Sequence, residues 1–218
     1  LGIFRNNSAV AKAFGVKPLQ PEKAVNLGAG FTSTISPHIN ITVDGYWIQI
    51  KNRIVLSGRF DKVNNADVRR LLINYPHIDQ VQFLANAIDT KNQGIDIVAG
   101  YKIALSDKLN LDNTLAATFS ETEITNINVP SDISSAGLEG DFFDGQEEAF
   151  LTIAQPRTKV NLTHNLSSEK WAILLRNVYF GEVTDPDEFS GQARVAGASV
   201  NDNAIYGGKV VTDLTLTN

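Results

Sequence analysis

The residues best suited to chemistry lie in one acidic and aromatic segment, "LEGDFFDGQEEAF", at residues 138–150. Around Phe142 and Phe143 it gathers the carboxylates of Asp141, Asp144, Glu147 and Glu148. An oxygen-rich cluster suits calcium, but the segment lacks the ligand spacing of an EF-hand loop. Besides a cation site, two interpretations stay open: a solvated acidic loop tip, or a loop that contacts a ligand through Phe142, Phe143 and Asp144.

Signatures of catalysis or metal binding are missing from the rest of the sequence. The three histidines, His38, His77 and His164, are far apart, and none forms an H-x-x-x-H pair. No G-x-S-x-G motif, P-loop or strand-to-helix G-x-G-x-x-G motif occurs. We therefore expect no catalytic residue, no metal site and no cofactor, and we interpret His164 as a packed or interfacial residue.

Composition narrows the class of protein. Of the 218 residues, 43% are hydrophobic and 20% are charged, so the chain should fold. A net charge of −5 without a basic face argues against a nucleic-acid partner. The lack of cysteine excludes disulfides, and no run approaches the roughly 18 apolar residues of a membrane helix. The chain begins at Leu1 and has no methionine, so we expect it to be a piece of a longer protein.

Apolar and polar residues alternate with a period of two over much of the sequence. Apolar side chains alternate with polar residues or glycine over residues 24–35, and the alternation resumes over residues 39–51 after the turn "SPH". Successive side chains of a β-strand point to opposite faces, so this pattern predicts a tight hairpin. The pattern predicts further strands at residues 80–88, 94–105, 109–121, 158–166, 171–182 and 208–217. The expected fold is all-β, an antiparallel up-and-down meander.

The two faces of the predicted meander differ in chemistry. One is apolar and carries Ile41, Ile97 and Leu115. The other is rich in Asn, Asp, Thr, Ser and Gly, and has little Lys or Glu. We expect this polar face to carry Asn40, Thr42, Asp44, Asp96, Lys102, Asp112 and Asp213.

Connections of very different length alternate along the meander. Turns of three or four residues lie at one end, and the long connections at the other cover residues 54–80, 122–157 and 183–205. Long loops without strands usually signal function or an unusual architecture. The first long connection contains one predicted helix, "NADVRRLLINYP", with Asn65 as its N-cap and Pro76 as its stop.

Two environments could explain a sheet with one apolar face. In a soluble β-sandwich, such as a ligand- or glycan-binding module, a second layer would cover that face. In a transmembrane β-barrel, lipid would cover it, and aromatic residues would mark the membrane interfaces. The sequence favours the barrel, because Trp47, Phe119 and Tyr179 fall near the long connections while Tyr101 and Trp171 fall nearer the short turns.

Several blocks, in order, resemble the barrel of outer-membrane TonB-dependent receptors. "LQPEKAVNLGAGF" and "INITVDGYWIQIKNRIVLSG" are similar to a family hairpin, and "NAIDTKNQGIDIVAGYKI" to the block that follows it. "QPRTKVNLTHNLSSEKWAILLRNVYFGEV" and "YGGKVVTDLTLTN" resemble later strands. Leu27 and Gly45 depart from the pattern, since the family more often has an aromatic residue there.

The resemblance covers nearly the whole chain from Pro18 onward. It implies that residues 1–218 form part of the C-terminal half of a large barrel in the outer membrane, with short periplasmic turns, long extracellular loops and further strands on both sides. It also implies active uptake of a scarce nutrient, such as siderophore-iron, cobalamin or a glycan, without covalent catalysis. The implied partners are outer-membrane lipid, the nutrient, and TonB acting through a plug domain that this sequence lacks. The polar residues would face the lumen.

Overall fold

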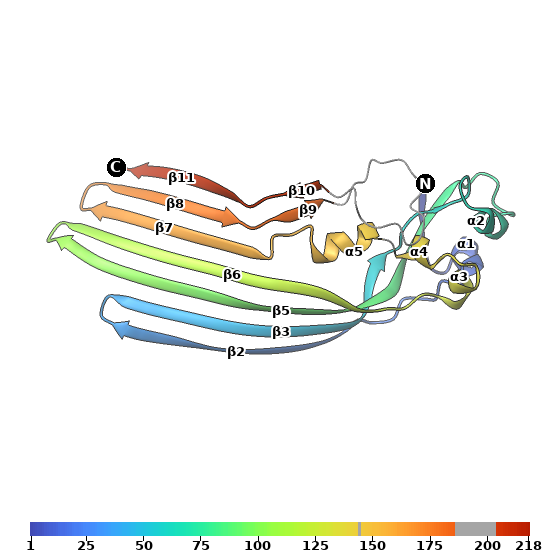
Figure 1. Ribbon diagram of the computed structural model, residues 1–218, viewed down its shortest axis with the longest axis horizontal. Coiled ribbons are helices and arrows are strands. Elements are labelled where there is room, and N and C mark those ends of the chain that lie inside the picture. Colours follow the sequence, from blue (N-terminus) through green and yellow to red (C-terminus); the bar gives the residue numbers. More distant parts are fainter. Residues whose placement is uncertain (144, 186–203) are drawn as a thin grey trace.

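The computed structural model describes residues 1–143, 145–185 and 204–218. Its main feature is a large sheet in which the strands follow the order β11-β8-β7-β6-β5-β3-β2 (Figure 1). The strands on this path are β2 (Lys23–Ser36), β3 (Ile39–Leu56), β5 (Gln80–Ser106), β6 (Leu109–Ile127), β7 (Thr158–Ser168), β8 (Ala172–Phe180) and β11 (Lys209–Thr217). Each pairs with its neighbours in the antiparallel sense. The predicted antiparallel meander is confirmed, and this sheet does not close on itself.

One strand is much longer than the sequence pattern indicated. The sequence pattern predicts separate strands at residues 80–88 and 94–105, but both belong to the 27-residue strand β5. The intervening "DTKNQ" is polar on both faces, which hides the alternation. The backbone ladder nevertheless continues through it, because Thr90 to Gln93 pair with β3 on one side and β6 on the other.

The three short turns use the same device. Each follows a serine whose hydroxyl oxygen accepts a hydrogen bond from the backbone N–H two residues later. The Oγ atoms of Ser36, Ser106 and Ser168 accept from the N–H groups of residues 38, 108 and 170 at 3.2, 3.4 and 3.3 Å. These turns lie together at one end of the sheet (Figure 1).

The opposite end carries a compact body that we call the cap: residues 1–17, 57–88 and 128–143. It contains β1 (Gly2–Phe4), α1 (Ala9–Ala13), β4 (Phe60–Asp61), α2 (Ala66–Leu71), α3 (Ser131–Ser135), α4 (Glu139–Phe142) and the first residues of β5 (Figure 1). β1 and β4 both pair with β5. The Phe14 ring lies 5.1 Å from that of Phe60 and 5.2 Å from that of Phe83. These three rings form the centre of the buried core of the described residues.

Helix α2 begins where the sequence predicted. The side chain of Asn65 accepts hydrogen bonds from the backbone N–H groups of Asp67 and Val68 at 2.9 and 3.4 Å, as an N-cap residue does. The α-helix ends at Leu71, earlier than the predicted stop at Pro76. Val68 and Leu72 bury their side chains in the cap core, so α2 closes one side of it.

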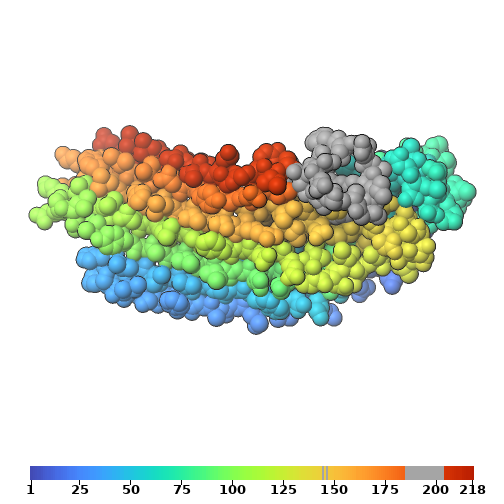
Figure 2. All heavy atoms as spheres, in the orientation of Figure 1, coloured from blue at the N-terminus to red at the C-terminus, as the bar shows by residue number. Residues whose placement is uncertain are grey.

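The sheet outside the cap is a single layer. On the face seen in Figure 2, the strands lie side by side and no other segment covers the half with the short turns. Large apolar side chains on this part remain exposed, such as Phe31 at 58% and Leu27 at 63%. The soluble sandwich is therefore wrong, because no second layer of the described residues covers the apolar face.

Three short elements of the described chain remain outside the main sheet and the cap. Helix α5 (Gly145–Thr152) lies between the cap and β7 along the chain. β9 (Val183–Asp185) and β10 (Ala204–Tyr206) form a separate antiparallel pair at the base of the third long connection, whose residues 186–203 lie outside the described part. None of the helices in the described ranges has the length and apolar character needed to cross a membrane.

Candidate functional site

The cross-strand register assigns side chains to the two faces. Residues paired directly on neighbouring antiparallel strands lie on the same face. Asp44 pairs with Asp96, and Lys102 pairs with Asp112. A second ladder runs from Asn40 through Gly100, Thr114, Thr163 and Arg176 to Asp213. With Thr42 two residues from Asp44, all seven residues expected on the polar side share one face, here called the polar face.

The polar face is tied together across its strands. Thr118 donates to Asp96 at 2.6 Å, and the Thr32 and Thr42 hydroxyls are 3.0 Å apart. Two guanidinium nitrogens of Arg176 donate to one carboxylate oxygen of Asp213, at 3.0 and 2.7 Å. This face can present both hydrogen-bond donors and acceptors to water or to another polar surface.

A glycine lets a large polar side chain lie flat on this face. Gly94 pairs with Tyr46, and a Cβ atom at position 94 would collide with the Tyr46 hydroxyl and lie 2.6 Å from the carbonyl oxygen of Phe119. Since that carbonyl belongs to the backbone, it could not move aside easily. The Gly94 position is therefore explained by close packing.

The opposite face, here called the apolar face, carries the ladder Ile41, Ala99, Leu115 and Leu162. It also carries a polar pair nearer the short turns, in which His164 Nδ1 lies 2.6 Å from Asn113 Oδ1. This contact agrees with the interpretation of His164 as a packed or interfacial residue. The described residues contain no cluster of three or more His, Asp or Glu side chains that could hold a metal.

A polar junction joins the sheet to the cap. Asn52 adopts a left-handed backbone conformation, with φ of 56°, at a bulge in β3. Asparagine tolerates this conformation better than most residues. Its N–H donates to Asp89 at 2.8 Å, and its carbonyl accepts from the Asn86 side chain at 2.6 Å. Asn86 also bonds both backbone groups of Gln20, at 2.7 and 2.8 Å, so one amide fixes the chain that leads into β2.

A cavity of about 440 Å³ lies next to this junction, between β3, the cap and α5. Its polar lining residues are Arg53, Arg59, Gln82 and Glu147, and its aromatic ones are Phe143 and Phe150. Arg53 Nη1 donates to the Thr90 hydroxyl at 3.3 Å, and Gln82 Nε2 donates to the Ser57 carbonyl at 2.9 Å. These bonds hold two of the polar side chains in place. The cavity thus presents two guanidinium groups and one carboxylate beside flat apolar surface.

Of the three predicted ligand-contact residues, Phe142 and Phe143 lie in different surroundings. Phe142 is 0% exposed in the cap core, so it has no surface for a ligand and stabilises the cap instead. Phe143 is 7% exposed and lines the cavity, while Asp144 lies outside the described residues. Sequence inspection missed Arg53 and Arg59, because one lies within β3 and the other just beyond its end, and neither belongs to a motif. Only the approach of α5 brings them into a common cavity with Phe143.

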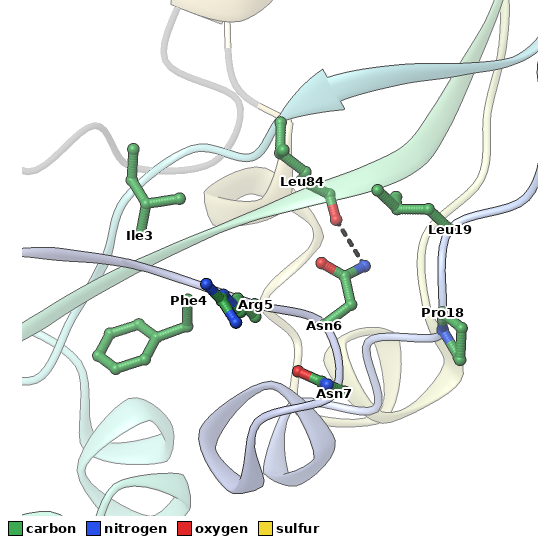
Figure 3. A pocket seen from close by; sticks show the side chains of 8 residues that line it. All are labelled: Ile3, Phe4, Arg5, Asn6, Asn7, Pro18, Leu19 and Leu84. Carbon is green, nitrogen blue, oxygen red and sulfur yellow. Dashed lines mark hydrogen bonds between the residues drawn. The ribbon is translucent and has the colours of Figure 1, made fainter.

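A second cavity, of about 410 Å³, lies at the edge of the cap (Figure 3). Ile3, Phe4, Leu19 and Leu84 give it a mainly apolar lining. The Asn6 amide points at the Leu84 carbonyl in Figure 3 and donates to it at 2.8 Å. Asn6 also donates to the Lys17 carbonyl at 2.8 Å, so it fixes the N-terminal segment on β5. We therefore interpret this cavity as a gap left where the N-terminal segment packs on β5, and not as a ligand site.

A single-layered antiparallel meander with one apolar and one polar face, short turns at one end and a capped opposite end defines the wall of an outer-membrane β-barrel. The family model "TonB dependent receptor-like, beta-barrel" matches residues 2–218, and the chain belongs to this family. Its place is therefore the outer membrane. No curated protein matches the sequence.

Solved structures support the same fold. The FrpB iron transporter from Neisseria meningitidis is 16% identical, with a TM-score of 0.56 over 92% of this chain and 25% of that one. The outer membrane transporter YddB from Escherichia coli is 7% identical, with a TM-score of 0.56 over 91% of this chain and 26% of that one. The chain thus spans about a quarter of the length of these transporters.

Proposed function

We propose that this chain is part of the barrel wall of a transporter that actively takes up a scarce nutrient through the outer membrane. The observation that carries the proposal is the two-faced single-layered sheet, whose apolar side chains stay exposed while a compact cap forms at the long-connection end. Such a sheet suits a bilayer, because lipid can cover an apolar face that would be costly in water. The family supports a transport role.

In this proposal the apolar face meets lipid and the polar face meets the lumen. Asn40, Asp44, Asp96 and their neighbours would contact water or a plug domain supplied by the rest of the receptor. TonB would energise uptake by acting on that plug. Charges such as Asp44 and Asp96 belong on the lumen side, because a charged group facing the hydrocarbon costs several kcal/mol, about 2–4 for a basic residue at the midplane.

The cavity beside Arg53 is our candidate for ligand contact. Among siderophore-iron, cobalamin and glycans, its arginines and phenylalanines favour an anionic chelate with an apolar part. Phe143 remains a candidate contact there, and Asp144 follows it in the chain. The proposed uptake involves no covalent catalysis by this protein.

Uptake by whole cells tests this function. Cells that make the complete receptor are compared with cells that lack it, using labelled ferric siderophore, cobalamin and oligosaccharide, each with TonB intact or deleted. We expect one ligand, the ferric siderophore, to accumulate only when both receptor and TonB are present. Accumulation without TonB, or of none of the three ligands, would overturn the proposal.

Two matched variants locate the ligand contact. Arg53→Gln should weaken binding of the transported chelate at least tenfold, because a charged hydrogen bond contributes roughly 1.5–3 kcal/mol. Arg70→Gln removes an arginine from the exposed side of α2, away from the cavity, and should leave binding unchanged. Equal effects of the two substitutions would remove the cavity from the proposal while leaving the uptake result intact.

A further inference from the structure

A belt of charged residues crosses the apolar face where the strands approach the cap. On β5 and β6, Lys91 Nζ lies 2.7 Å from Glu123 Oε2. Just before β7, Arg157 Nη1 lies 3.3 Å from Glu121 Oε1. Lys91 is an even number of residues from Ile97 along β5, so it belongs to the apolar face. In this part of the belt, each basic group is neutralised by a carboxylate of the neighbouring chain segment.

The belt has a different composition on β2 and β3. Lys23 and Lys51 are direct cross-strand partners, and both side chains are exposed. Two-residue steps along β2 lead from Lys23 to Val25 and Leu27, and Leu27 pairs with Trp47. The lysine pair therefore lies on the apolar face, next to a band of large apolar residues. Like charges directly opposite each other destabilise a sheet. A bound anion would remove this repulsion between the two lysines.

The described part of the chain does not supply that anion. None of its carboxylates forms an ion pair with Lys23 or Lys51. Asp89 lies opposite this end of β3, but its Oδ1 accepts the backbone N–H of Asn52 at 2.8 Å. Both ammonium groups thus remain available to whatever surrounds the apolar face.

We propose that Lys23 and Lys51 together bind the phosphate group of a lipid in the outer leaflet, with Leu27 and Trp47 against its acyl chains. The charge of the pair complements a phosphate, and lysine is a common phosphate ligand. The cap end of the strands is the extracellular end, which places the pair at the level of the outer headgroups. The inference rests on the assignment of faces in the proposed function.

The matched pair Lys91–Glu123 provides a control within the same belt. Attraction to an anionic lipid surface amounts to roughly a fivefold gain in affinity per basic residue, so removing two lysines should weaken binding roughly 25-fold. Lys91→Gln removes a lysine that already has an internal partner and should change binding little. Substitution of both Lys23 and Lys51 by arginine keeps the charge and should keep the lipid.

The experiment uses the complete receptor, purified in detergent and incubated with lipid A. Bound lipid is counted by native mass spectrometry for the wild type, the double variant Lys23→Gln/Lys51→Gln, the double arginine variant and Lys91→Gln. A second arm uses lipid A from which both phosphates have been removed, and a third uses inorganic phosphate. The gel shift of heated against unheated samples checks that each barrel is folded.

We expect the wild type to retain lipid A, the glutamine double variant to lose most of it, and dephosphorylated lipid A to bind poorly to every protein. Inorganic phosphate should not stay bound, because it lacks the acyl chains. Equal retention by the wild type and the glutamine double variant would overturn the proposal, as would an equal loss in Lys91→Gln. Nutrient uptake is measured in the same variants and should not change, so failure of the lipid site is distinguishable from failure of the transport function.

Discussion

The cap buries its large apolar side chains, whereas the sheet leaves many of its own exposed. In the cap, Phe14, Phe60 and Phe83 are 0% exposed and contact one another. In the sheet, Phe31 and Phe119 lie on a face that no other described element covers. Phenylalanine is therefore buried in a core in one region and exposed on the sheet surface in the other. The difference supports the proposed arrangement, in which water surrounds the cap and lipid covers the apolar face of the sheet.

The two regions also use hydrogen bonds differently. The sheet satisfies its backbone through regular ladders, as a bilayer requires. The cap and its junction rely on side chains, such as Asn86 and Asn6, that bond backbone groups of distant segments. Irregular segments can thus be held firmly where water is present and strand pairing ends.

The largest difference between the regions should appear when a phenylalanine is removed from each. Phe83→Ala leaves a cavity at the centre of the cap and should lower the free energy of cap opening by about 3–5 kcal/mol. Phe119→Ala removes an exposed ring from the apolar face of β6 and should leave cap opening unchanged. Hydrogen exchange of the cap amides in the membrane-embedded receptor measures this free energy. Equal exchange in the two variants would contradict an independent cap core.

Placing an arginine on either face of β6 tests whether the two faces of the sheet lie in different surroundings. Leu115→Arg puts a guanidinium group on the apolar face six residues from the short turn, and should cost about 2–4 kcal/mol of barrel stability. Thr114→Arg places the same group on the polar face and should cost far less. Equilibrium unfolding in lipid vesicles gives both values. A larger loss for Thr114→Arg would reverse the assignment of the faces.

The smallest expected effect concerns acid on the surface of the cap. The Ser134 hydroxyl donates to Glu139 at 2.7 Å, and this bond, with a backbone bond within Glu139, holds the pKa of Glu139 below its ordinary 4.5. A lowered folded-state pKa contributes stability above pH 4.5, and that contribution disappears as the pH falls through the folded-state pKa. Ser134→Ala should therefore raise the pKa of Glu139 towards 4.5.

Titration of the Glu139 carboxyl by NMR from pH 6 to pH 3 measures the shift. Ser135→Ala removes a neighbouring hydroxyl on the exposed surface of α3 and serves as the control, with no expected change. An unchanged pKa in Ser134→Ala would show that the hydroxyl does not act on this carboxylate. Because Glu139 is fully exposed, the loss of cap stability in acid should be small.

The sequence by itself determined the order of the main strands and the face on which each side chain lies. Alternation between faces is a local property of the extended chain, so the meander, the short serine turns and the common face of Asp44, Asp96 and Asp213 could all be predicted from residue order. The continuity of β5 could not, because the polar segment "DTKNQ" breaks the apolar rhythm while its backbone still pairs on both sides.

Only the tertiary structure decided the cap and its cavity. The cap core joins residues 1–17, 57–88 and 128–143, which are separated by whole hairpins in the chain. No local periodicity reveals that Phe142 is buried, or that Arg53 and Phe143 line one cavity, since these contacts depend on how distant segments meet. The alternation of apolar and polar residues along a strand depends on what surrounds each face of that strand, so it can be seen in the sequence. Which loop residues contact one another depends on how distant segments pack, so it cannot.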